Sequence, residues 1–151
     1  MGVPWREIFG NEHPVEVEIG PERGTFLLAT AANHPERNYF GIERSATRTR
    51  AFEATLARRR LPNVRVVNAD ATCVLRTLIG PCSVSAYHIY FPDPWWKRRH
   101  HRRRLITPEF AALLARTLAR GGTIYLVTDV RETFDLAVEG LRSIPLLVQD
   151  L

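Results

Sequence analysis

The sequence predicts an α/β fold, a doubly wound and mostly parallel sheet with helices on both faces. Stretches typical of strands and of helices alternate from end to end, without repeats or linkers, and such alternation favours parallel strands joined by right-handed crossovers. Residues 84–91 are almost continuously apolar, which is typical of a central strand covered on both faces. With 151 residues, the chain (residues 1–151) is expected to form one domain.

Local patterns define the elements of the first half of the chain. Residues 1–14 show no periodicity and are expected to be irregular. Alternating apolar and acidic residues predict the first strand, and Ser45 can cap a long helix. Pro35 and Pro62 end helices, because the residue before a proline disfavours the helical conformation. The sequence therefore predicts strands at residues 15–19, 38–42 and 63–67 and helices at residues 25–33, 46–60 and 71–79.

The second half continues the alternation after a mainly apolar strand and a basic loop. Thr107 can cap the next helix, which has Pro108 at its first position. The pair Gly121 and Gly122 is expected to end that helix, because glycine is favoured just past a helix C-terminus. An apolar stripe at helical spacing predicts one more helix. The expected elements are strands at residues 84–91, 123–128 and 144–148 and helices at residues 108–120 and 131–141.

One loop, FPDPWWKRRHHRRR at residues 91–104, carries the basic excess of the protein. The formal net charge is +5, and removal of the six Lys and Arg residues between 97 and 104 leaves 5 − 6 = −1. A solvated basic face is the plain alternative, but the run also holds Trp95 and Trp96 and follows Asp93. With a sequence pI near 9.9, this concentration indicates that the loop binds a polyanion, most simply a nucleic acid.

Composition excludes several classes of protein. No apolar run approaches the length of a membrane span, and the first residues lack the apolar core of a signal peptide, so we expect a cytoplasmic protein without a membrane partner. Cys73 and Cys82 stand at no metal-ligand or redox spacing. They are expected to be buried free thiols in a reducing compartment, and no metal is expected.

Carboxylates stand at or beside the end of each of the first five strands. Because the carboxyl ends of parallel strands meet at one edge, these side chains should line one rim. An acid after the second strand suits ribose hydroxyls, and one after the third suits an adenine amino group, which favours an adenosine-containing cofactor. For each acid taken singly, a helix cap or a solvated loop is the alternative. The five residues are Glu18, Glu43, Asp70, Asp93 and Asp129.

The segment YFPDPWWKRRHHRRRLITPEF, residues 90–110, resembles the signature of the tRNA (guanine-N(7)-)-methyltransferase family of class I S-adenosylmethionine-dependent methyltransferases. A proline-flanked aspartate followed by tryptophan and a basic run is a rare combination. Shorter matches are EIG at residues 18–20, GIE at 41–43, NADA at 68–71, GG at 121–122 and VTD at 127–129. The resemblance runs from about residue 15 to residue 141 and implies a Rossmann-like methyltransferase fold.

The resemblance also implies a role for each matching residue, with S-adenosyl-L-methionine as cofactor and tRNA as substrate. Glu18 and Gly20 would lie at the methionine end of the cofactor, Glu43 at its ribose and Asp70 at its adenine. Asp93 would stand at the reacting centre between cofactor and guanine. The implied substrate contacts are Lys97, Asp129, Arg98, Arg99, Arg102 and Arg103. A carboxylate near the purine would stabilise the positive charge that it gains with the methyl group.

The sequence departs from the family pattern in two ways. The glycine-rich turn has Glu22 where the family usually has its middle glycine, and this residue could weaken cofactor binding. The chain is also expected to lack the last strand or strands of the family and a Thr-x-x-Glu segment, so that a monomer or a weak homodimer is expected. These departures leave two alternatives open, namely a non-catalytic RNA-binding module and a methyltransferase with another RNA or a small molecule as acceptor.

Overall fold

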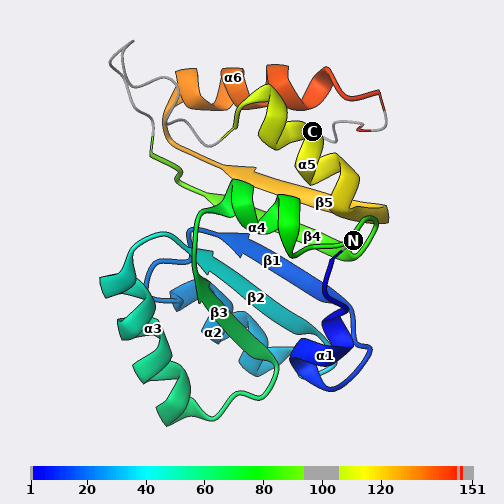
Figure 1. Ribbon diagram of the computed structural model, residues 1–151. Coiled ribbons are helices and arrows are strands. Elements are labelled where there is room, and N and C mark those ends of the chain that lie inside the picture. Colours follow the sequence, from blue (N-terminus) through cyan, green and yellow to red (C-terminus); the bar gives the residue numbers. More distant parts are fainter. Residues whose placement is uncertain (1, 94–105, 146, 148–151) are drawn as a thin grey trace.

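A computed structural model gives the structure of residues 2–93, 106–145 and 147 (Figure 1). Its centre is a five-stranded sheet with the order β3-β2-β1-β4-β5, and every neighbouring pair is parallel. The order reverses between β1 and β4, which confirms the doubly wound sheet. The strands are β1 (Val15–Ile19), β2 (Asn38–Glu43), β3 (Val64–Asn68), β4 (Val84–Tyr90) and β5 (Leu118–Val127).

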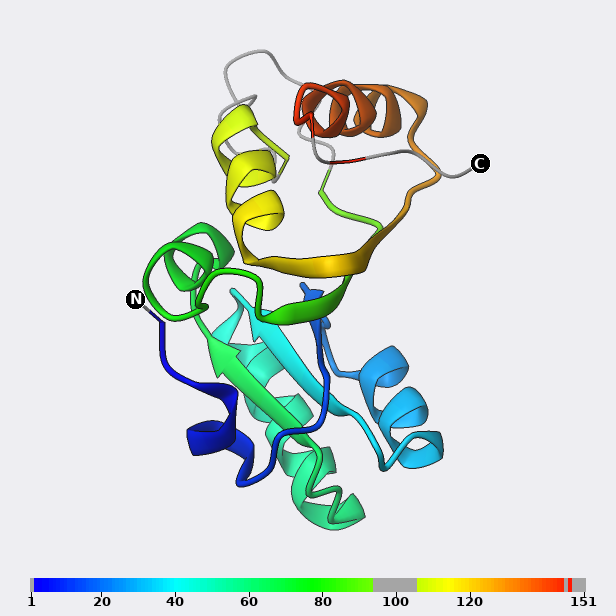
Figure 2. The ribbon, with the colours of Figure 1, turned by 90° about the vertical axis from the view of Figure 1, so that its right-hand side faces the viewer.

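Helices cover both faces of the sheet, as the sequence predicts (Figure 2). On one face, α2 and α3 bury Leu27 and Phe52 in a cluster with Tyr39. On the other face, α1, α4 and α5 join a larger cluster that includes Leu75 and Phe110, and α6 packs against α5. The helices are α1 (Trp5–Phe9), α2 (Thr25–Asn33), α3 (Ala46–Arg59), α4 (Ala71–Thr77), α5 (Pro108–Thr117) and α6 (Arg131–Arg142).

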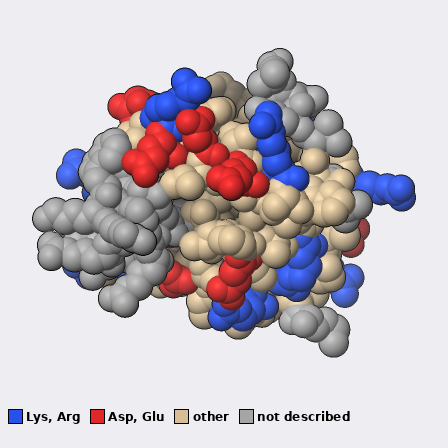
Figure 3. Space-filling model, turned by 90° about the horizontal axis from the view of Figure 1, so that it is seen from above, with Lys and Arg blue, Asp and Glu red and all other residues tan. Residues whose placement is uncertain are grey.

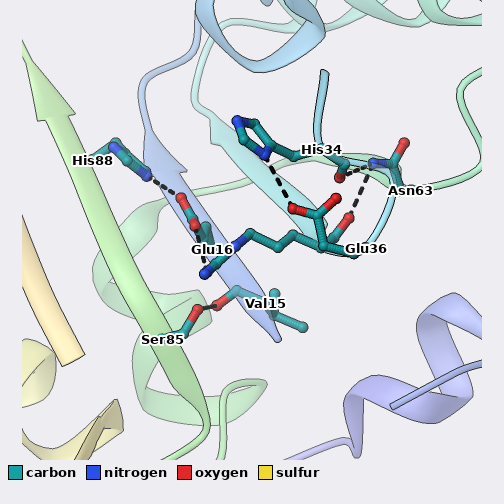
Figure 4. Close-up of polar contacts among 8 residues, drawn as sticks. Val15, Glu16, His34, Glu36, Asn63, Ser85 and His88 are labelled. Atoms are coloured by element: carbon teal, nitrogen blue, oxygen red, sulfur yellow. Dashed lines mark hydrogen bonds and ion pairs between the residues drawn. The ribbon is translucent and has the colours of Figure 1, made fainter. Parts of the chain in front are cut away.

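Hydrogen bonds from buried polar groups tie the elements together. The Asn63 side chain donates from Nδ2 to the carbonyl oxygens of Ala31, His34 and Arg37, at 3.1, 3.1 and 3.0 Å, part of which is drawn in Figure 4. It thereby joins the start of β3 to the end of α2 and to the turn that follows α2. Buried carbonyls need such partners, because an unpaired one costs about 1–3 kcal/mol.

The predicted irregular leader is wrong for five residues, because α1 occupies Trp5–Phe9. The Trp5 ring lies 5.1 Å from the Phe40 ring, and its Nε1 donates to the Ser83 carbonyl at 2.9 Å. Phe9 is buried in the larger core cluster. A helix of this length shows no periodicity in sequence, so only these tertiary contacts reveal it.

The boundary between α5 and β5 also differs from the prediction. The helix ends at Thr117, and the strand already begins at Leu118, so the glycine pair lies inside the strand and does not cap the helix. Val84 pairs with Leu118 but Ala86 pairs with Thr123, which means that β5 bulges between them. Glycine suits this bulge, since Gly121 has φ +76°.

Two smaller expectations are also wrong. Residues 144, 145 and 147 do not form the predicted last strand, and residues 146 and 148 lie outside the part that the structure describes. Cys73 and Cys82 are free, as expected, but both are exposed and not buried. Among the described residues, every helix is too short or too polar to cross a membrane.

Candidate functional site at the carboxyl edge of the sheet

A cavity of about 980 Å³ opens at the carboxyl ends of the strands. The ends of β1, β2 and β4, the residues before α4, and the first turns of α2 and α5 contribute its walls. This is the edge where doubly wound sheets bind ligands, beside the point at which the strand order reverses. Of the residues singled out from the sequence, Glu18, Gly20, Glu43, Asp70 and Asp93 all line the cavity.

Glu18, at the end of β1, is a buried carboxyl group of the cavity. The residue is 4% exposed, and its Oε2 finds no hydrogen-bond partner among the described residues. Burial, together with the nearby charges of Glu22 and Glu43, raises the pKa of Glu18 to about 8. The cavity therefore holds a buried acid that would gain from a positively charged partner.

Glu43 links the end of β2 to the glycine-containing turn. Its Oε2 accepts a hydrogen bond from the Glu22 backbone N–H at 2.8 Å, and its Oε1 accepts one from the Ser45 N–H at 2.9 Å. Both bonds fix the orientation of a side chain that is 3% exposed. Each carboxylate oxygen keeps a second lone pair, with which it can accept from ribose hydroxyls.

The turn at residues 20–24 uses left-handed backbone at three positions, with φ +72° at Gly20, +56° at Glu22 and +82° at Gly24. At Gly24 a side chain is impossible, since a Cβ atom would lie 2.1 Å from the Phe52 ring. Glu22 adopts the conformation that glycine takes without strain. Its side chain is 67% exposed, and a carboxylate oxygen lies 3.5 Å from Arg48. The side chain is thus largely in solvent, although the residue lines the cavity.

Asp70 and Asp93 reach the same rim from different loops. Asp70 caps α4, where its Oδ1 accepts a hydrogen bond from the Cys73 N–H at 3.0 Å. Asp70 therefore acts as a helix cap, the alternative considered from the sequence, and also lines the cavity. Asp93 is exposed and stands two positions after Phe91, whose φ of +49° turns the chain as it leaves β4.

The remaining residues singled out from the sequence are not gathered into the cavity. Asp129 is exposed between β5 and α6 and is absent from the described residues that line the cavity. The basic residues Lys97, Arg98, Arg99, Arg102 and Arg103 lie outside the described residues, as do Trp95 and Trp96.

The outer side of α6 carries exposed acids, which gather in the view from above (Figure 3). Glu132, Asp135 and Glu139 stand three and four positions apart on the helix and are all exposed. This spacing puts them on one side of the helix. Asp135 accepts from Arg131 Nε at 3.1 Å, so this side of α6 carries charges of both signs.

The family is decided by a match over almost the whole chain, since the methyltransferase family Methyltransf_4 matches residues 12–150. The chain belongs to this methyltransferase family. Proteins named tRNA (guanine-N(7)-)-methyltransferase are among its relatives: one from Rhodopirellula baltica is 37% identical over 142 residues, and one from Thiobacillus denitrificans is 45% identical over 122 residues. These alignments cover 91% and 81% of this chain but 52% and 54% of the relatives. The chain thus spans about half the length of these curated relatives.

Solved structures agree with this family in fold. A precorrin-6y methyltransferase from Geobacter metallireducens superposes with a TM-score of 0.69 at 22% identity, covering 86% of this chain and 61% of that chain. An O-methyltransferase from Thermotoga maritima superposes with a TM-score of 0.67 at 16% identity, covering 93% and 48%. The resemblance to tRNA (guanine-N(7)-)-methyltransferases and the Rossmann-like methyltransferase fold are both confirmed.

The sequence missed one part of this candidate site, a polar network on the sheet face that α2 covers. Glu16, His88 and Tyr90 form it, and Tyr90 also lines the cavity. A sequence signal existed, because Glu16 and Glu18 alternate on β1 and His88 and Tyr90 alternate on β4, so each pair lies on one face of its strand. The register that pairs Glu18 with His88 was not predictable.

Proposed function

We propose that the chain is a single S-adenosylmethionine-dependent methyltransferase domain that transfers a methyl group to the 7-nitrogen of guanine in tRNA. The observation that carries the proposal is the cavity beside the point where the strand order reverses. Asp93 of the PDPW motif, which follows β4, lines this cavity together with Glu18 at the end of β1 and Glu43 at the end of β2. The relatives that bear this activity in their names support the choice of acceptor.

The residues of the cavity fit S-adenosylmethionine. Bound there, the cofactor supplies an electrophilic methyl group on a positively charged sulfur. The unpartnered buried oxygen of Glu18 suits the cationic methionine part, and the turn at Gly20 lets backbone approach it closely. Glu43 keeps lone pairs for the ribose, and the exposed oxygen of Asp70 is available to the adenine.

Asp93 would act by its charge and not as a base. The 7-nitrogen of guanine has a free in-plane lone pair, so no proton has to be removed before it attacks. The purine gains positive charge as the methyl group arrives, and a carboxylate held nearby stabilises that charge. The rest of the task is placement of the two reactants in line.

We further propose that Lys97, Arg98, Arg99, Arg102 and Arg103 hold tRNA phosphates and that Asp129 contacts the substrate. Six Lys and Arg residues between 97 and 104 give this segment the charge to do so, and phosphate binding of this kind weakens steeply with salt. The proposal includes a cytoplasmic location and a monomer or weak homodimer.

The test is transfer of labelled methyl from S-adenosylmethionine to unmodified tRNA, followed by nucleoside analysis. We expect label in 7-methylguanosine, and we expect Asp93→Ala to lower the rate at least a hundredfold while the protein stays folded. Glu139→Ala, which removes an exposed acid of α6, is the matched control and should keep the parental rate. Near-normal activity of Asp93→Ala would refute its assigned role.

Two results would replace the proposed function. Folded protein that binds tRNA but transfers no label would favour a non-catalytic RNA-binding module. Label on another nucleoside, or equal activity on acceptors without phosphates, would favour a methyltransferase with a different acceptor.

A further inference from the structure

A chain of three hydrogen-bonded side chains runs along the sheet towards the cavity. Glu16 Oε2 lies 2.6 Å from His88 Nε2, as Figure 4 shows, and His88 Nδ1 lies 2.6 Å from the Tyr90 hydroxyl. Glu16 and His88 have side-chain exposures of 13% and 7%. We call these three residues the relay. None of the roles assigned above to the cavity residues explains why the buried His88 imidazole is hydrogen-bonded to Tyr90.

The protonation of the relay follows from its first member. Glu16 also accepts from Arg37 Nη1 at 3.0 Å, and the hydrogen bond from His88 is the main reason why the pKa of Glu16 lies below its usual value. Glu16 is therefore a carboxylate, which can only accept hydrogen bonds. It follows that His88 carries a proton on Nε2.

The second nitrogen of His88 then determines how Tyr90 presents its oxygen. In the neutral ring Nδ1 is an acceptor and takes the hydroxyl proton of Tyr90. The Tyr90 oxygen consequently turns only lone pairs towards other partners.

The environment of His88 holds this geometry in place. Its ring stacks on Tyr125 at a centroid distance of 5.1 Å and an interplanar angle of 9°. Phe26 packs on it from α2 at 4.9 Å and meets the Tyr90 ring edge-on at 5.0 Å. Because the rings of Phe26, Tyr90 and Tyr125 all pack against the imidazole, it has little freedom to rotate away from Glu16.

Tyr90 is a lining residue of the cavity and interacts electrostatically with Glu18. Both residues line the cavity together with Phe26, and burial, followed by the charge of Glu18, raises the pKa of Tyr90 to about 12. The hydroxyl therefore stays protonated and within electrostatic reach of Glu18. An acceptor oxygen, an unpartnered carboxyl oxygen and an aromatic wall together suit a positively charged group.

We propose that Tyr90, oriented by Glu16 and His88, is a positioning residue for the positively charged sulfonium part of the cofactor. The inference rests on the proposed function, since it names the part of the cofactor that this wall recognises. After transfer the cofactor becomes S-adenosylhomocysteine, whose sulfur is neutral. Tyr90 thus favours the cofactor over the spent product and aids exchange of the two.

The test compares dissociation constants of S-adenosylmethionine and S-adenosylhomocysteine by isothermal titration calorimetry. Tyr90→Phe keeps the ring and removes the acceptor. This change should raise the dissociation constant of S-adenosylmethionine roughly tenfold, as for a lost hydrogen bond to a charged partner. It should change the dissociation constant of S-adenosylhomocysteine by no more than about twofold. Tyr125→Phe, which removes a hydroxyl from the neighbouring ring that stacks on the same His88, is the matched control and should change neither constant.

The relay itself is tested at His88. His88→Leu leaves Tyr90 in place but frees its proton, so the preference for S-adenosylmethionine should fall as in Tyr90→Phe. The double variant should lose no more than either single one, because both changes remove the same acceptor. His88→Gln, whose amide can donate to Glu16 and accept from Tyr90, should restore part of the preference.

The outcomes separate the inference from the proposed function. If Tyr90→Phe weakened the binding of both ligands equally, Tyr90 would only form part of the cavity wall, and the inference would be overturned. An unchanged ratio of the two dissociation constants would overturn it as well. If the His88 variants do not fold, Tyr90→Phe decides alone. Failure of the parental protein to bind either ligand would refute the proposed function and, with it, the inference; binding with an unaltered preference refutes the inference alone.

Discussion

Replacement of Glu18 by glutamine should make the protein more stable at about pH 9 and change its stability little at about pH 5. Glu18 is buried at the end of β1, with Glu22 and Glu43 close enough to oppose its ionisation. In the unfolded chain the same carboxyl group is solvated and ionises freely. Glutamine has nearly the same shape and cannot ionise, so it removes the cost of a buried charge and keeps the packing.

The magnitude follows from the pKa of Glu18, which folding raises from 4.5 to about 8. Between these pH values the unfolded chain has lost the proton and the folded protein has kept it, so the free energy of unfolding falls as pH rises. The fall is about 1.4 kcal/mol per pH unit at most. Over the whole interval Glu18 therefore costs on the order of 5 kcal/mol, and the cost levels off above about pH 8.

Urea unfolding of the parent and of Glu18→Gln across this pH range measures the effect. The difference between the two free energies of unfolding isolates Glu18, because the other titrating groups are common to both proteins. We expect the difference to grow with pH in favour of the glutamine variant and then to become constant. Glu139→Gln, at an exposed acid of α6, should give a flat difference. Parallel curves for Glu18→Gln and the parent would refute the reasoning.

Three further substitutions test other parts of the structure by thermal or urea unfolding. Glu22→Gly should stabilise the protein by about 0.5–1 kcal/mol, because glycine adopts the left-handed backbone at this position without strain. The exposed ion pair with Arg48 that is lost contributes little, and a loss of stability would contradict the presence of strain. Asn63→Ala should cost about 2–4 kcal/mol, since it leaves three carbonyl oxygens without their donor, and Asn63→Asp should not rescue it. Asp70→Ala should cost about 1 kcal/mol through loss of the α4 cap, whereas Asp70→Asn should keep most of it, and equal losses for the two would argue against capping.

The sequence predicted the five strands of the sheet and most of the helices because their signals are local. The apolar and acidic alternation of β1, the continuous apolar run of β4 and the Ser45 cap of α3 all appear within a few neighbouring residues. Where a signal had two local meanings, the prediction failed. A glycine pair fits a helix end as well as a bulge, and only the pairing of β5 with Val84 and Ala86 selects the bulge.

The site divides in the same way. The carboxylates of the cavity were predictable, since parallel strands bring their carboxyl ends to one edge whatever the details of packing. Asp129 shows the limit of this argument, because it follows β5 but does not line the cavity with the others.

The sequence by itself determined the order of the five sheet strands, four acids of the cavity rim and the family, because each depends on residue types at short spacings. Only the tertiary structure decided the raised pKa of Glu18 and the relay from Glu16 through His88 to Tyr90. Glu16 and His88 stand 72 positions apart, and the register between β1 and β4 brings them together. Burial and long-range register are set by the packing of the whole chain, so no local pattern contains them.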